Sequence, residues 1–171
     1  MTKSFAMSLA MSLDLSGLAK TLKADQEHIQ QATRAGAQAG AELLYQEVKG
    51  NASRIKKKTG LLAASIYQVF AANESAPGTA TYYVSWRTGG KSGLPRAPHG
   101  HLVEFGHLQR YEVSHDPKTG RFITHKDRPL AQPKQIPAKP FVRPAAARLP
   151  QALDAAEKRF LETLAAHGVT R

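Results

Sequence analysis

Hydrophobic residues between about Leu15 and Val48 recur with the period of an α-helix. The positions that repeat every seven residues along this segment are Leu15, Leu22, Ile29, Gly36 and Leu43. They share one helical face. Alanine and glycine are frequent over residues 35–41, so another backbone can approach that face closely. We expect a long helix packed on the sheet of its own domain; the alternative is that part of the face packs on a neighbouring subunit.

The helix is predicted to end at Gly50 and Asn51, because both residue types tolerate the left-handed conformation of a C-terminal cap. A basic loop follows, and Thr59 can cap a short helix over residues 60–65. Residues 66–72 and 80–87 then read as two strands, separated by a turn that contains proline and glycine.

A second hairpin is predicted for residues 111–114 and 121–125, because Asp116-Pro117-Lys118-Thr119-Gly120 between them is a strong turn sequence. Residues 88–97 are rich in glycine and proline, and residues 127–139 form an extended stretch interrupted by prolines. We expect both of these segments to be mobile loops.

A second amphipathic helix is predicted from Pro144 to about His167. Proline is favoured in the first helical turn, and Gly168 is expected to end the helix. The internal Pro150 should kink or restart it. The predicted apolar stripe consists of Leu149, Leu153, Ala156, Phe160 and Leu164.

This order of elements predicts an α+β fold. It would contain a long N-terminal helix, an antiparallel sheet built from two hairpins, and a C-terminal helix packed on one face. The 171 residues suit a single domain, 1–171, with its core at about 15–167. No apolar run approaches the roughly 20 residues of a membrane span, and residues 1–15 do not have the pattern of an export signal.

The net charge of +11 is concentrated in the middle of the chain. Residues 49–143 carry sixteen basic and five acidic side chains, whereas both flanks are close to neutral. A bias of this kind attracts nucleic acid, an acidic protein surface or anionic lipid, and it does not distinguish among them.

Catalytic and metal-binding patterns are weak. The chain has no cysteine, which excludes thiolate ligands, cysteine nucleophiles and disulfides. His99, His101 and His107 are close in sequence, but they lie in a glycine- and proline-rich region without a helical zinc motif. No serine has a nucleophile-elbow context, and Gly90-Lys91-Ser92 lacks the first glycine of a phosphate loop. We therefore expect no catalytic residue, no metal and no cofactor.

Three segments resemble the tail-completion family of long-tailed bacteriophages, also called head–tail joining or minor tail proteins. The first is Thr59-Gly60-Leu61-Leu62-Ala63-Ala64-Ser65-Ile66. The second is Ala97-Pro98-His99-Gly100-His101-Leu102-Val103-Glu104-Phe105-Gly106. The third is Pro137-Ala138-Lys139-Pro140-Phe141-Val142-Arg143-Pro144-Ala145. Their order and spacing are similar to those of the family over about residues 15–167. Val142 stands where leucine is commoner, and His107 where threonine is frequent.

Elementary chemistry suggests structural roles for the motif residues. Thr59 and Gly60 can turn the chain into the short helix, and Gly106 allows a tight exit. Val103 and Phe105 are expected in the core, and Glu104 can pair with Arg143 or a lysine. The prolines of the third segment, Pro140 and Pro144 among them, should stiffen the chain there so that Phe141 is delivered into a pocket.

The resemblance implies a non-enzymatic virion protein, assembled in the host bacterial cytoplasm, that forms a homo-oligomeric ring, expected to be hexameric, at the phage neck. Its partners would be further copies of itself, the head connector and the tail tube or terminator proteins, with viral DNA passing through the ring. The expected docking or lumen contacts are Arg54, Lys56, Lys57, Lys58, Lys91 and Arg96.

Two other functions remain open at this point. A basic nucleic-acid-binding domain would explain the charge without a ring, and it predicts DNA affinity that falls steeply with salt. A tail-terminator or head-completion ring would have the same α+β layout at another position in the particle.

Overall fold

The computed structural model describes residues 9–14, 26–55, 60–89, 93–118 and 122–168. The longer elements in chain order are β1 (Leu9–Asp14), α2 (Gln26–Arg54), α3 (Leu61–Ser65), β2 (Ile66–Phe70), β3 (Thr79–Trp86), α4 (Gly100–Phe105), β4 (His107–His115), β5 (Phe122–Ile136) and α5 (Leu149–Ala166). Two short 3-10 helices, η1 (Ala72–Glu74) and η2 (Arg143–Arg148), precede β3 and α5. The predicted α+β class, with a long helix near each end, is confirmed.

The sheet that carries the core has three antiparallel strands in the order β1-β3-β2. The predicted hairpin of β2 and β3 is confirmed, with Ile66 opposite Trp86 and Phe70 opposite Tyr82. Strand β1 completes the sheet on the other side of β3. The sequence prediction did not include this strand.

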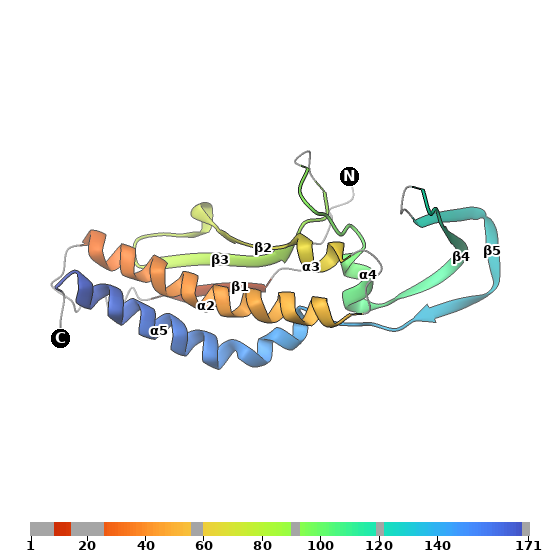
Figure 1. The fold of residues 1–171 in the computed structure, drawn as a ribbon. Helices are drawn as coiled ribbons and strands as arrows, with labels where there is room; N and C mark the ends of the chain where they lie inside the picture. Colours follow the sequence, from red (N-terminus) through yellow and green to blue (C-terminus); the bar gives the residue numbers. More distant parts are fainter. Residues whose placement is uncertain (1–8, 15–25, 56–59, 90–92, 119–121, 169–171) are drawn as a thin grey trace.

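The second predicted hairpin is also present, but β4 and β5 form a separate two-stranded sheet instead of extending the first one. Figure 1 shows this ribbon projecting from the end of the molecule where α4 lies. Residues 127–136, predicted as part of a loop, belong to β5. We refer to β4 and β5 together as the arm.

Helix α2 lies between the three-stranded sheet and α5 (Figure 1). Its buried positions follow a spacing of three and four residues, as an amphipathic helix requires. Ala37 and Ala41 pack against Ala80 and Tyr82 of β3. The small-residue face therefore packs within the chain, as we had favoured.

Helix α2 continues through Asn51 to Arg54, so the predicted end at Gly50 and Asn51 is wrong. Instead of capping the helix, Asn51 donates a hydrogen bond from Nδ2 to the backbone oxygen of Phe141, at 3.2 Å. A tertiary contact thus uses the side chain that the sequence had suggested as a stop signal.

Helices α2 and α5 run antiparallel. At one end the imidazole rings of His28 and His167 stack with their centroids 4.4 Å apart. At the other end Arg148 donates from Nε to Oε2 of Glu47 at 3.3 Å. Pro150 lies in the first turn of α5, directly after η2, which confirms the predicted restart.

The buried stripe of α5 consists of Ala152, Ala156, Phe160 and Leu164. Leu149 and Leu153, which were predicted to belong to it, are exposed. Ala152 and Ala156 occupy the buried positions in this part of α5 and pack in one core cluster with Leu44 and Val48 of α2. Their small side chains allow the two helices to approach closely. Gly168 follows the helix with a φ of 74°, in agreement with the predicted end.

Candidate functional site

The three motif segments meet at the base of the arm, in the main hydrophobic core. Phe141 is fully buried, and its ring packs edge-on against Trp86 with centroids 5.3 Å apart. Ile66 from the first segment belongs to the same core cluster, and Val103 from the second packs against it. The predictions that Phe141 enters a pocket and that Val103 contributes to the core are confirmed.

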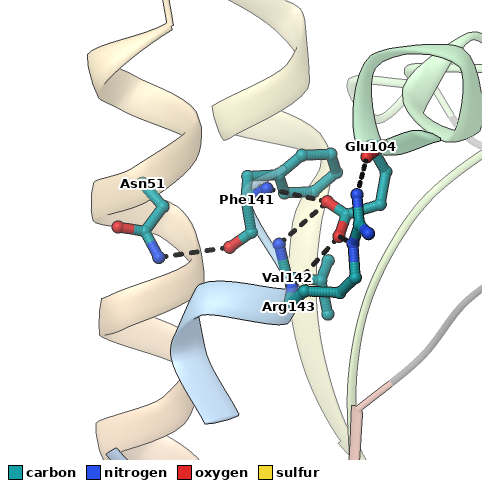
Figure 2. Close-up of polar contacts among 5 residues, drawn as sticks. All are labelled: Asn51, Glu104, Phe141, Val142 and Arg143. Carbon is teal, nitrogen blue, oxygen red and sulfur yellow. Dashed lines mark hydrogen bonds and ion pairs between the residues drawn. The ribbon is translucent and has the colours of Figure 1, made fainter. Parts of the chain in front are cut away.

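Glu104 is the centre of this site, and its side chain is completely buried. Its Oε2 accepts hydrogen bonds from the backbone N–H of Phe141 at 2.7 Å and of Val142 at 3.0 Å. Its Oε1 accepts one from the backbone N–H of Arg143 at 3.1 Å. Figure 2 shows the carboxylate aimed at these three consecutive amides. One side chain thus provides the hydrogen-bond acceptor for the backbone N–H groups of all three residues at the turn that leads into η2.

Arg143 completes the arrangement. Its Nε donates to Oε1 of Glu104 at 3.1 Å, and its Nη2 donates to the backbone oxygen of Glu104 at 2.6 Å. The predicted pairing of Glu104 with Arg143 is confirmed. We call Glu104 together with residues 141–143 the carboxylate clamp.

Burial is the largest single influence on the pKa of Glu104 and acts to raise it. The backbone hydrogen bonds from Val142, Phe141 and Arg143 and the bond from the Arg143 side chain act in the opposite direction, and together they hold the pKa below its ordinary value. The clamp therefore contains an ionised carboxylate at neutral pH.

Phe105 departs from its predicted place in the core, because its side chain is 53% exposed. Neighbouring helical residues point in directions about 100° apart. Since Glu104 points inward to the three amides, Phe105 is turned toward the surface. There its ring lies 5.2 Å from the guanidinium carbon of Arg143, a cation–π contact that helps to cover the clamp.

Two glycines allow the chain to pass closely beside the clamp. A Cβ on Gly100 would lie 2.2 Å from Nε1 of Trp86, and one on Gly106 would lie 2.6 Å from the backbone oxygen of Ile136. Gly106 also has a φ of 71°, which side chains of L-residues disfavour. The predicted tight exit at Gly106 is thus confirmed, and it fixes where β4 leaves the body.

The end of β5 is tied to the same place. Lys139, three residues after β5, donates its backbone N–H to the backbone oxygen of Val103 at 2.8 Å. Pro140 is exposed directly before the buried Phe141, and Pro144 is exposed in the first turn of η2. Both strands of the arm therefore leave the body at one place, set by the clamp and Gly106.

The arm itself is exposed along most of its length. Its strands pair near the base from His107 opposite Ile136, and near the tip from Glu112 opposite His125. The pairing is irregular around Tyr111, which lies opposite Pro129. Proline has no N–H to donate to a sheet, so it is found at such irregularities and at sheet edges.

The structure describes two of the six basic residues that were expected to make partner contacts. Arg54 lies at the exposed end of α2 and donates from Nη1 to Oδ1 of Asn51 at 2.9 Å. Arg96 is exposed in the segment before α4. Lys56, Lys57, Lys58 and Lys91 lie outside the described residues, as does Thr59 of the first motif, whereas Gly60 has a φ of 71° directly before α3.

One pair of side chains on the arm resembles a fragment of a catalytic site. Oγ of Ser114 lies 2.8 Å from Nε2 of His125, across the two strands. Both residues belong to an open ribbon in which Glu112 pairs with Arg128 at 3.8 Å. Nucleophilic catalysis also needs a third group that orients the base, and donors for an oxyanion. No other described residue forms a hydrogen bond with the His125 ring, so this pair is better explained as a cross-strand contact.

The described part of the chain contains no cluster of metal ligands and no helix that could span a membrane. No three histidine or acidic side chains there converge as a metal site would require. None of its helices has the length and hydrophobicity needed to cross a membrane.

Comparison of the chain with protein-family models, with curated proteins and with solved structures yields no match in any of the three.

Proposed function

We propose that the chain is a structural subunit of a tailed bacteriophage that forms a ring at the neck, completes the tail and joins it to the head. The proposal begins with the resemblance of three sequence segments to the tail-completion family. Its expected partners are further copies of the chain, the head connector, the tail tube or terminator proteins, and the viral DNA in the lumen.

The observation that carries the proposal is the clamp between the second and third motif segments. Glu104 and Arg143 are 39 residues apart in sequence, yet they form two hydrogen bonds with each other. The same carboxylate binds the amides of Phe141 and Val142. The motif residues thus act together to hold a projecting arm, a device suited to a subunit that binds neighbouring subunits.

The basic charge fits the same function. A ring through which DNA passes benefits from a positive lumen or docking face, because phosphates attract lysine and arginine. Nucleic-acid binding without a ring would use the same charge, so affinity of the purified chain for a short DNA duplex, measured over a salt series, separates the two. Strong, salt-sensitive binding by a chain that never assembles would favour the nucleic-acid function.

The decisive experiment is deletion of the gene from the phage genome that encodes it. Electron microscopy of the lysate should show DNA-filled heads and separate tails, and supplying the chain from a plasmid should restore joined particles. Joined, infectious particles without the chain would contradict the proposal. Unjoined tails of uncontrolled length would favour the tail-terminator alternative.

The basic loop gives a more local test. Replacing Lys56, Lys57 and Lys58 together by glutamate should lower infectious yield, because the reversed charges would repel an acidic partner or DNA. The matched control replaces the same lysines by arginine, which keeps the charge. A normal yield from the glutamate variant would remove this loop from the docking surface.

A further inference from the structure

The arm exposes apolar side chains that nothing in the described chain covers. Leu108, Tyr111, Val113 and Ile123 are between 37% and 47% exposed. Because residues opposite each other in an antiparallel pair share a face, Val113 with Thr124 and Ser114 with Ile123 lie on opposite faces. Both faces of the ribbon are therefore partly apolar. A two-stranded ribbon is marginally stable in water without a surface to pack on.

The arm is also basic. Its two strands contain four basic and two acidic residues. Arg128 lies within 3.8 Å of both acidic residues, Glu112 and Asp127. Arg110, Lys126 and Lys134 are exposed and have no ion pair with another described residue. A partner for the arm should thus be apolar and acidic.

Such a surface lies on α5 of the same chain. Leu153 and Leu161 are 49% and 52% exposed, and Asp154 and Glu157 are exposed beside them. With 3.6 residues per turn, these four residues fall within about 100° of the helix circumference. Neither carboxylate forms an ion pair with the described residues, whereas Glu162, farther round the helix, pairs with Arg159 at 3.5 Å. We call Leu153, Asp154, Glu157 and Leu161 the α5 strip.

The arm does not cover the α5 strip of its own chain. Figure 1 shows the arm extending beyond the end of the body near α4, whereas α5 runs from that end in the opposite direction. The clamp and Gly106 hold the base of the arm in this position. Contact between the two surfaces therefore requires two copies of the chain.

We propose that the arm of one copy docks on the α5 strip of a second copy, with its apolar side chains against Leu153 and Leu161 and its basic side chains beside Asp154 and Glu157. The two surfaces differ, so the contact is heterologous and can repeat from copy to copy. This inference deepens the proposed function by giving the ring its subunit contact, and it rests on that function for ring closure.

Pairing of two arms edge to edge is the main alternative for a second copy. Strand β5 contains Pro129 and Pro133, which cannot donate hydrogen bonds to an added strand. The remaining open edge, that of β4, is nine residues long and irregular around Tyr111. The side chains of the arm are thus better suited to docking than its backbone edges are.

Charge exchange tests the contact in solution. Two variants are needed: Asp154→Lys with Glu157→Lys on the strip, and Lys126→Glu with Lys134→Glu on the arm. Each should self-associate at least about tenfold more weakly than the wild-type chain in sedimentation velocity at low salt, because like charges then face each other. An equal mixture of the two should associate again, since every docked pair in it can have opposite charges.

The control for the helix variant is Glu162→Lys, which changes charge on α5 away from the strip. It should associate like the wild type, and circular dichroism should show that all variants are folded. If the wild type associates but is insensitive to the two variants, or if the mixture does not recover, the inference is wrong while the proposed function stands. Joined particles after gene deletion would instead refute the proposed function.

A disulfide test distinguishes docking on α5 from pairing of arms. The chain has no cysteine, so Val113→Cys and Leu153→Cys each introduce a single thiol. Mixing the two variants under mild oxidation should give the mixed dimer in preference to either homodimer. A predominant Val113→Cys homodimer would indicate arm-to-arm pairing. A wild-type chain that stays monomeric, with no mixed dimer, would also overturn the inference.

Discussion

Arg143 binds Glu104 twice, with Nε 3.1 Å from the carboxylate Oε1 and Nη2 2.6 Å from the backbone oxygen. The carboxylate is buried, while the arginine side chain is 48% exposed. The guanidinium therefore covers the carboxylate on its solvent side, whereas the three backbone amides donate their hydrogen bonds to it from the protein side. Both removal of the buried carboxylate and its protonation are therefore expected to destabilise the fold.

Removal of the Glu104 carboxylate should destabilise the fold strongly. Glu104→Ala leaves three backbone amides and Nε of Arg143 without their acceptor, whereas Nη2 of Arg143 keeps the backbone oxygen of residue 104. We expect the free energy of unfolding to fall by about 3–5 kcal/mol. Glu104→Gln keeps one acceptor oxygen and should cost less, about 1–3 kcal/mol. Urea denaturation measures both values.

The matched control for the clamp is Glu47→Gln. Glu47 pairs with Arg148 at 3.3 Å near the surface, where an ion pair contributes less than about 1 kcal/mol. A loss from Glu104→Ala no larger than that of the control would mean that the clamp does not hold the fold together.

The stabilisation by Glu104 should disappear in acid. Because its folded-state pKa is lowered, the unfolded chain takes up this proton first as the pH falls. The contribution is complete above pH 4.5, the ordinary pKa of the group, and is lost as the pH falls through the folded-state pKa. The difference in unfolding free energy between the wild type and Glu104→Gln should therefore narrow below pH 4.5. A difference that widens there would contradict the assigned direction of the pKa shift.

Gly106→Ala and Gly50→Ala should have opposite effects on thermal stability. At Gly106 the added methyl group meets the backbone of residues 136–138 and the φ of 71° is strained, so a loss of about 1–3 kcal/mol or more is expected. At Gly50, inside α2, the added Cβ would meet no atom within 4 Å apart from its chain neighbours and the nearby backbone of its own helix, and alanine should gain about 1 kcal/mol in helix propensity. Calorimetry of the two variants checks this, and a stabilised Gly106→Ala variant would refute the close approach at the arm base.

Phe141 and Phe105 belong to motif segments that meet at the clamp, but they should tolerate truncation differently. Phe141→Ala removes a fully buried ring from beside Trp86, which should cost about 3–5 kcal/mol. Phe105→Ala removes an exposed ring that contacts Arg143, which should cost less than about 1 kcal/mol. Guanidinium denaturation of both variants provides the test; equal losses would show that Phe105 is buried after all.

Much of the secondary structure could be predicted because its signals are local. The spacing from Ile29 to Val48 indicated a helix, the turn before Thr79 indicated a hairpin, and Gly168 indicated a helix end. Strand β1 was missed. Six residues carry little signal of their own, and their conformation depends on pairing with β3, which lies 65 or more residues later.

The candidate site shows the same contrast between features with a local sequence signal and features that depend on distant segments. Pairing of Glu104 with Arg143 or a lysine was expected because Glu104 is the only carboxylate in its neighbourhood of the sequence. The hydrogen bonds that it also accepts from three backbone amides leave no trace in the sequence, because every residue except proline has such an amide. The exposure of Phe105 was missed for a related reason, since it follows from the inward direction of Glu104.

By itself, the sequence determined the two long helices and the two hairpins, because hydrophobic period, turn residues and caps act over a few neighbouring positions. It did not show β1 or the extension of β5 through residues 127–136. The tertiary structure alone decided that the second hairpin stands apart as an arm, that α2 continues past Asn51, and that Leu153 faces outward. Each of these outcomes depends on contacts between segments distant in sequence, such as Asn51 with Phe141 and Glu104 with residues 141–143. Such contacts form only when the chain closes on itself, and no local pattern encodes them.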